Sequence, residues 1–165
     1  VIFVKPNSAI CMDVFSDANE EIHYEAELSF IITANKISAV GVGLDLTKRD
    51  LQTKLKAKGL PWERAKAFDN SAVFSEFVSF KGELEKLSLQ LFINDQLVQQ
   101  GHFSLMIYKP EEIITEVSSF MSFSDGDVLM TGTPKGVGKI FVNDQFTAKV
   151  FSDEKLLIEK KWTVK

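Results

Sequence analysis

Apolar and polar residues alternate through much of the chain, and the first long alternation runs from about residue 22 to residue 33. This period of two predicts a β-strand, in which residues of one parity share a face. The apolar face would carry Tyr24, Ala26, Leu28, Phe30 and Ile32. The opposite face would carry His23, Glu25, Glu27 and Ser29. A turn near residues 34–36 ends this strand.

Glu25 and Glu27 place two carboxylates on the same face of the predicted strand. The rise per residue separates their Cβ atoms by about 7 Å. Mutual repulsion at that spacing is relieved by a bound cation or by a shared proton. A solvated acidic face on an edge strand is the alternative, and the spacing alone does not exclude it.

Residues 39–46 form a second alternating segment. Val42, Leu44 and Leu46 would lie on one face of this strand, with Gly41, Gly43 and Asp45 on the other. Glycines beside an acid either leave room for a ligand or allow another backbone to cross closely.

A helix is predicted to follow, with Thr47 as its N-cap and Asp50 completing a motif close to a capping box. Its inner stripe would consist of Leu51, Leu55 and the alkyl part of Lys58. Gly59 and Pro61 provide the stop signal. Arg49 lies in the first turn, where it opposes the helix dipole. It is either a surface residue that tolerates this penalty or a group placed to receive an anion.

The remaining pattern is β-rich. It predicts a short helical turn over residues 61–68, coil with short strands over 69–80, a hairpin of 87–93 with 96–101, and strands over 140–150 and 156–164. Pro110 opens a helix that we expect to run to about Met121. The buried stripe of that helix would be Ile113, Ile114, Val117 and Phe120. We therefore predict an α+β fold with two or three helices inserted between strands.

The loop over residues 131–138 contains three glycines, two threonines and a proline. Bare backbone N–H groups and hydroxyls of this kind can receive an anion. The spacing does not match a Walker loop, and no helix is predicted to follow. A tight structural turn is the competing interpretation.

Composition narrows the function classes. A length of 165 residues with 45% hydrophobic content fits one domain with a substantial core. The net charge of −4, without a basic block, argues against nucleic acid or an anionic membrane as the main partner. No apolar run approaches the roughly 20 residues of a membrane span. A single cysteine, Cys11, indicates a reducing compartment.

The candidate chemistry rests on oxygen ligands. His23 and His102 lie far apart in sequence, and neither a nucleophile elbow nor a zinc-binding cluster is present. Glu25, Glu27 and Asp45 form an all-oxygen set of the kind that suits Mg²⁺ or Mn²⁺.

Several motifs occur together and in a fixed order. They are Lys5-Pro6 with Ser8, His23–Leu28, Asp45–Asp50, Lys58–Trp62 with Ala65-Lys66, Gly126-Asp127, and Thr131–Pro134 with Gly136–Gly138. In this order the sequence resembles the fumarylacetoacetate hydrolase family, especially its acylpyruvase-like branch. The resemblance covers most of the chain. It implies one catalytic domain over residues 1–165, with mixed β-sheets rolled around a metal site.

The resemblance also implies roles for individual residues. Glu25, Glu27 and Asp45 would bind a divalent metal, usually Mg²⁺, with Mn²⁺ or Ca²⁺ as substitutes. Lys66 would face the oxo groups of the substrate as the catalytic residue. Arg49, Gln52 and Thr133 would hold the substrate carboxylate or its neighbouring oxygen. A homodimer in the cytoplasm, without nucleic-acid or membrane partners, is the corresponding expectation.

The activity that the resemblance implies is hydrolysis of a C–C bond in acylpyruvate-type 2-oxo acids through a metal-stabilised enolate. Hydrolytic members carry a water-activating His and Glu on an N-terminal lid that precedes the Lys-Pro motif. This chain begins at Val1, and neither His23 nor His102 matches that histidine, so we expect the natural protein to be longer. The alternatives are tautomerisation or decarboxylation of oxaloacetate, isomerisation or hydration of unsaturated 2-oxo dicarboxylates, and a non-catalytic family member.

Overall fold

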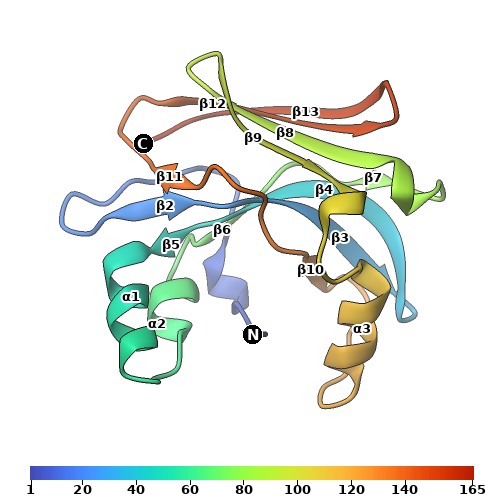
Figure 1. Ribbon diagram of the computed structural model, residues 1–165, viewed down its shortest axis with the longest axis horizontal. Coiled ribbons are helices and arrows are strands. Elements are labelled where there is room, and N and C mark those ends of the chain that lie inside the picture. Colours follow the sequence, from blue (N-terminus) through green and yellow to red (C-terminus); the bar gives the residue numbers. More distant parts are fainter.

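Two β-sheets pack face to face, and the helices lie beyond the outer side of one of them (Figure 1). The structure is a computed structural model that describes all residues from 1 to 165. The six-stranded sheet contains β1 (Ile10–Cys11), β6 (Ala72–Phe74), β4 (Lys36–Asp45), β3 (Ala26–Thr33) and β10 (Val128–Met130) in that order, with β7 (Val78–Ser79) also paired to β4. The four-stranded sheet contains β13 (Lys155–Thr163), β12 (Gln145–Ser152), β8 (Leu87–Ile93) and β9 (Gln96–His102).

A small three-stranded sheet lies at one end of the sandwich. It consists of β11 (Gly138–Lys139), β2 (Ile22–Tyr24) and β5 (Thr47–Lys48). The α-helices are α1 (Arg49–Ala57), α2 (Glu63–Lys66) and α3 (Pro110–Ser118). Short 3₁₀ turns occur at Asn7–Ala9, Leu84–Lys86 and Phe103–Leu105. The predicted α+β, β-rich class with two or three helices is confirmed.

The core lies between the two large sheets, because one face of β3 and β4 is almost wholly apolar. The predicted apolar residues of residues 22–33 are all buried, and Val42, Leu44 and Leu46 join the same cluster. The antiparallel register pairs Ala26 with Leu44 and Glu27 with Gly43, so alternation along each strand is matched across the pair. The other parity therefore faces away from the sandwich, towards the helices.

The first predicted strand is not continuous. It divides at Glu25 into β2 and β3, and the two parts belong to different sheets. At this break the Glu25 carbonyl accepts the N–H of Asp45 at 2.8 Å, which joins the backbones of the two residues.

The space above the two glycines of β4 is filled by side chains. A Cβ atom on Gly41 would lie 2.7 Å from the ring of Phe77, and one on Gly43 would lie 2.6 Å from the Ser29 hydroxyl. The interpretation of these glycines as room for a ligand is wrong. They allow aromatic and apolar side chains to pack against the outer face of the sheet.

Four details of the predicted helices are wrong. Thr47 is not an N-cap, because α1 begins at Arg49 and has Lys48 at its cap position without a side-chain hydrogen bond. Lys58 is exposed, although Gly59 ends the helix with a φ of 62° as expected. The third helix stops at Ser118, and Phe120 is 61% exposed rather than buried. None of the helices has the length and apolar character that crossing a bilayer requires.

Gly136 provides a direct test of the loop that follows β10. Its φ of +105° is unfavourable for any other residue, and an added Cβ would lie 2.1 Å from the carbonyl oxygen of Val98 on β9. Gly126, with a φ of +97°, has open space around it and serves as the matched control. We expect Gly136→Ala to lower the free energy of unfolding by about 3 kcal/mol or more, and Gly126→Ala by about 1 to 2 kcal/mol. Urea unfolding measures both, and equal losses would contradict the close approach of loop and strand.

Candidate metal and substrate site

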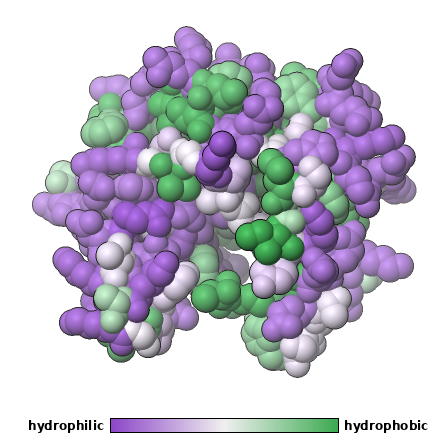
Figure 2. Space-filling view, viewed as in Figure 1, coloured by the Kyte–Doolittle hydropathy of each residue, from purple (hydrophilic) through white to green (hydrophobic).

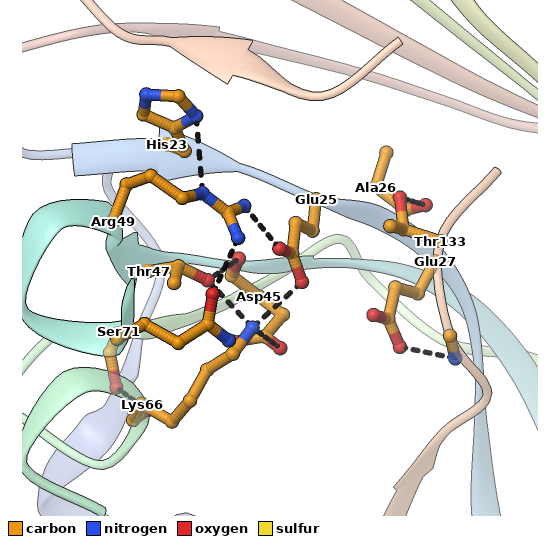
Figure 3. Close-up of polar contacts among 12 residues, drawn as sticks. His23, Glu25, Ala26, Glu27, Asp45, Thr47, Arg49, Lys66, Ser71 and Thr133 are labelled. Atoms are coloured by element: carbon orange, nitrogen blue, oxygen red, sulfur yellow. Dashed lines mark hydrogen bonds and ion pairs between the residues drawn. The ribbon is translucent and has the colours of Figure 1, made fainter. Parts of the chain in front are cut away.

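Three carboxylates meet where β3 and β4 leave the sandwich (Figure 3). Glu25 lies at the break between β2 and β3, Glu27 is on β3, and Asp45 is the last residue of β4. The strand register brings Asp45 beside Glu25, and one oxygen from each residue lies within 4.8 Å of the others. The structure thus brings together the three acids predicted from the sequence.

Lys66 supplies one counter-charge from α2. Its Nζ donates to Glu25 Oε2 and Asp45 Oδ2, each at 2.7 Å, and to Thr47 Oγ1 at 2.6 Å. The side chain of Lys66 is only 3% exposed. Sequence reasoning missed Thr47 as part of this site, because a threonine before a helix is usually a cap.

Lys5 supplies a second ammonium group. It lies 2.8 Å from Asp45 Oδ1 and donates to the backbone carbonyls of Lys66 and Ser71 and to the Ser71 hydroxyl. Burial lowers the pKa of Lys5 despite the attraction of Asp45. The Lys5-Pro6 motif was visible in the sequence, but nothing in its pattern indicated that Lys5 would reach the acids.

Arg49 lies on the far side of the acids from the cleft and contacts Glu25, Gln52 and His23. Its guanidinium donates to Glu25 Oε1 at 2.5 Å and to Gln52 Oε1 at 2.6 Å, while its Nε faces His23 Nδ1 at 3.4 Å. The other ring nitrogen of His23 lies 2.6 Å from Glu21. Burial acts to raise the pKa of Glu25, but Lys66 and Arg49 bring that pKa below its ordinary value.

Glu27 differs from the other two acids because no cation contacts it. Its side chain accepts the N–H of Gly132 at 2.7 Å, and the residue is only 4% exposed. Burial, together with the charge of Asp45, raises the pKa of Glu27 to about 8. A buried carboxyl with a backbone donor and no counter-charge is costly to ionise.

The donor set fits a hard divalent cation. Carboxylate oxygens are the ligands that Mg²⁺ and Mn²⁺ prefer. Asp45 Oδ1 is buried and accepts no hydrogen bond, since Lys5 approaches it outside hydrogen-bonding angles. A cation among the three acids would add a bond to this oxygen, which has an ion pair with Lys5 but no hydrogen bond, and would give ionised Glu27 the counter-charge that it lacks.

The acids open into a cleft of about 1600 Å³. Figure 2 shows the surface hollowed between a lobe formed by α1 and α2 and a lobe formed by α3, with apolar side chains around the hollow. Gln52, Lys66 and Thr133 line this cleft together with the three acids. Arg49 is absent from its lining, so the structure gathers three of the four predicted substrate and catalytic residues at the cleft and places Arg49 behind them.

Thr133 reaches the cleft from the loop after β10, but its hydroxyl is already engaged. The hydroxyl donates to the carbonyl of Ala26 at 2.8 Å, and the hydroxyl oxygen accepts a hydrogen bond from Gln99 Nε2 at 2.8 Å. Neither of the two histidines contacts the three acids directly. His23 contacts Arg49 and Glu21, and His102 contacts Ser104 at the surface.

Comparison with known proteins agrees with this geometry. The family model for the fumarylacetoacetate (FAA) hydrolase C-terminal domain matches residues 1–161. The chain belongs to the fumarylacetoacetate hydrolase family. The predicted family membership and the predicted fold class are therefore confirmed.

Named relatives narrow the comparison. The oxaloacetate tautomerase YcgM of Escherichia coli is 39% identical over 166 residues, which cover 89% of this chain and 75% of that protein. The human mitochondrial oxaloacetate tautomerase FAHD1 is 34% identical over 167 residues, which cover 91% of this chain and 76% of that protein. The crystal structure of a fumarylpyruvate hydrolase from Pseudomonas aeruginosa, in complex with Mn²⁺ and pyruvate, superimposes with a TM-score of 0.87. It is 27% identical, and the match covers 98% of this chain and 77% of that one.

Glu27 makes the metal-free protein sensitive to pH. The unfolded chain ionises Glu27 above its ordinary pKa of 4.5, whereas the folded chain keeps it protonated to about pH 8. Folding therefore takes up a proton in this window, and the contribution of Glu27 to stability falls as pH rises from 4.5 to 8.

We expect wild type to lose stability relative to Glu27→Gln by about 1 to 3 kcal/mol between pH 5 and pH 8 when a chelator is present. The amide keeps an acceptor for Gly132 and does not ionise. Urea unfolding of the two proteins across this range measures the difference. Parallel pH profiles would show that Glu27 is not held protonated by its surroundings.

Proposed function

We propose that this chain catalyses the keto–enol tautomerisation of oxaloacetate with a divalent metal, Mg²⁺, held by Glu25, Glu27 and Asp45. The observation that carries the proposal is Glu27, a buried carboxyl without a counter-charge, grouped with two other acids at an open cleft. The names of the two tautomerases described above support the choice of substrate.

The metal, when bound, would supply Lewis acidity that favours negative charge on the substrate's C2 oxygen. Mn²⁺ in the fumarylpyruvate hydrolase structure supports a divalent ion at this type of site. All three ligands must be ionised to bind it, so metal binding and deprotonation of Glu27 are coupled.

Gln52 would receive the carboxylate next to the oxo group. Its amide oxygen is occupied by Arg49 at 2.6 Å, which leaves the amide N–H groups as the free face of a side chain that lines the cleft. Arg49 would then act through Gln52 and Glu25 rather than by touching substrate. Backbone N–H groups of the loop over residues 131–138 would serve the other end of the carboxylate, since the hydroxyl proton of Thr133 is committed to Ala26.

Lys66 would move the proton. Tautomerisation transfers one proton between C3 and the C2 oxygen, and no water is consumed. Lys66 lines the cleft, and its ammonium group donates to Glu25, Asp45 and Thr47 within 2.7 Å. In the enol-to-keto direction this ammonium would give one proton to C3, and the resulting amine would take the proton of the C2 hydroxyl, so the lysine returns to its starting state. Hydrolysis of an acylpyruvate would require a water-activating base in addition to these groups. We favour tautomerisation because two relatives that share 39% and 34% of their aligned residues with this chain are named oxaloacetate tautomerases.

The homodimer and the cytoplasmic location remain predictions from the sequence. The relative FAHD1 is mitochondrial by name.

Lys66→Met tests the proposal, because methionine keeps much of the side-chain length and removes the ammonium. We expect loss of enol absorbance from freshly dissolved enol oxaloacetate to be Mg²⁺-dependent in wild type and slower by about 100-fold or more in Lys66→Met. Lys54→Met, an exposed lysine on α1, is the matched control and should retain full activity.

Two outcomes would contradict the proposal. If folded wild type with Mg²⁺ converts enol oxaloacetate no faster than buffer alone, the protein is not a tautomerase of this substrate. A higher kcat/KM for cleavage of an acylpyruvate than for the oxaloacetate reaction assigns the chain to hydrolysis instead.

A further inference from the structure

Gln99 is a buried polar residue that the proposed chemistry does not use. It lies on β9, in the four-stranded sheet, and is 1% exposed. Its side chain crosses from that sheet to the acid site. Oε1 accepts the N–H of Ala26 at 3.0 Å, and Nε2 donates to Thr133 Oγ1 and to the carbonyl of Pro134, each at 2.8 Å.

These bonds form a closed ring with Ala26 and Thr133. The Thr133 hydroxyl donates to the Ala26 carbonyl at 2.8 Å (Figure 3). Because Gln99 accepts the Ala26 N–H, both backbone groups of Ala26 are bound by side chains. The direction of each bond is forced, because a backbone N–H can only donate and a carbonyl can only accept. The Gln99 amide thus makes three hydrogen bonds: its oxygen accepts one, and its nitrogen donates two.

The position of Ala26 gives the ring its significance. Ala26 separates Glu25 from Glu27, at the break between β2 and β3 where the backbone leaves one sheet for another. The loop that contains Thr133 also provides the Gly132 N–H that holds Glu27 at 2.7 Å. A single buried amide therefore fixes both the peptide between two acids and the loop that orients one of them.

We propose that Gln99 is a positioning residue for the metal site, and that it sets the spacing of Glu25 and Glu27 through Ala26 and the Thr133 loop. This inference rests on the metal site of the proposed function, but not on the substrate. The close packing of the same loop on β9 supports it, since Gly136 lies against Val98 and Pro134 against Gly101, on either side of Gln99.

Mn²⁺ affinity, measured by electron paramagnetic resonance titration, tests the inference without any activity assay. Gln99→Leu removes the amide and keeps the volume approximately. We expect it to weaken Mn²⁺ binding by about tenfold, in the range of residues that orient metal ligands. Gln100→Leu, the exposed neighbour on β9, should bind Mn²⁺ as wild type does.

Two further variants separate positioning from general stability. Val150→Ala enlarges the space at a fully buried position on β12, a strand that does not pair with β9, and should lower the melting temperature while leaving the Mn²⁺ dissociation constant within twofold of wild type. Thr133→Val opens the ring from the loop side and should weaken Mn²⁺ binding by a similar factor to Gln99→Leu. The variant with both substitutions should bind Mn²⁺ no more weakly than the single variant with the lower affinity, because each substitution breaks the same ring.

The outcomes are distinct. Wild-type Mn²⁺ affinity in Gln99→Leu, or in Thr133→Val should Gln99→Leu fail to fold, overturns the inference. Additive losses of Mn²⁺ affinity in the double variant, or an equal loss in Val150→Ala, also overturn it. A wild-type chain that binds no Mn²⁺ removes the metal site and this inference together. A chain that binds Mn²⁺ but does not tautomerise oxaloacetate removes only the proposed function.

Discussion

The constraint on which the site depends is the closeness of three carboxylates, which lie within 4.8 Å of one another with Glu27 and Asp45 buried and Glu25 mostly so. Like charges at that distance, away from water, repel strongly unless cations or protons compensate them. The protein meets this constraint unevenly. Lys66 and Arg49 neutralise Glu25, and Lys5 and Lys66 neutralise Asp45, whereas Glu27 has only a backbone N–H. The uncompensated acid is the one that a divalent cation would complete.

The fold explains how such an arrangement is tolerated. The sandwich core between the two large sheets buries the apolar parity of β3 and β4 and fixes their register. The alternate residues of β3 and β4 must then point away from the core. Packing on the apolar side of these strands therefore holds the acids together on the other side. The stability of the core offsets the free-energy cost of holding like charges close together in the site. Functional sites in proteins commonly carry such a local cost.

Much of this was predictable from the sequence, for physical reasons. The period of two placed Glu25 and Glu27 on one face, and Gly59 ended α1 where it should. Contacts between distant segments were not predictable in this way. Lys5 and Gln99 reach the site from 21 and 73 residues away from Ala26 respectively, and only the tertiary fold brings them there. Thr47 and the two glycines of β4 misled the prediction because their commonest local roles, a cap and open space, were replaced by contacts from other elements.

Protons released when Mg²⁺ binds provide the most direct test of the account. Glu27 has a pKa of about 8 without metal and must ionise to act as a ligand, so binding near pH 6.5 should release about one proton. Calorimetric titration of Mg²⁺ in two buffers of different ionisation enthalpy measures this number. We predict about one proton per ion for wild type and close to none for Glu27→Gln. Binding of Mg²⁺ by wild type without proton release would contradict the claim that Glu27 is protonated in the metal-free protein.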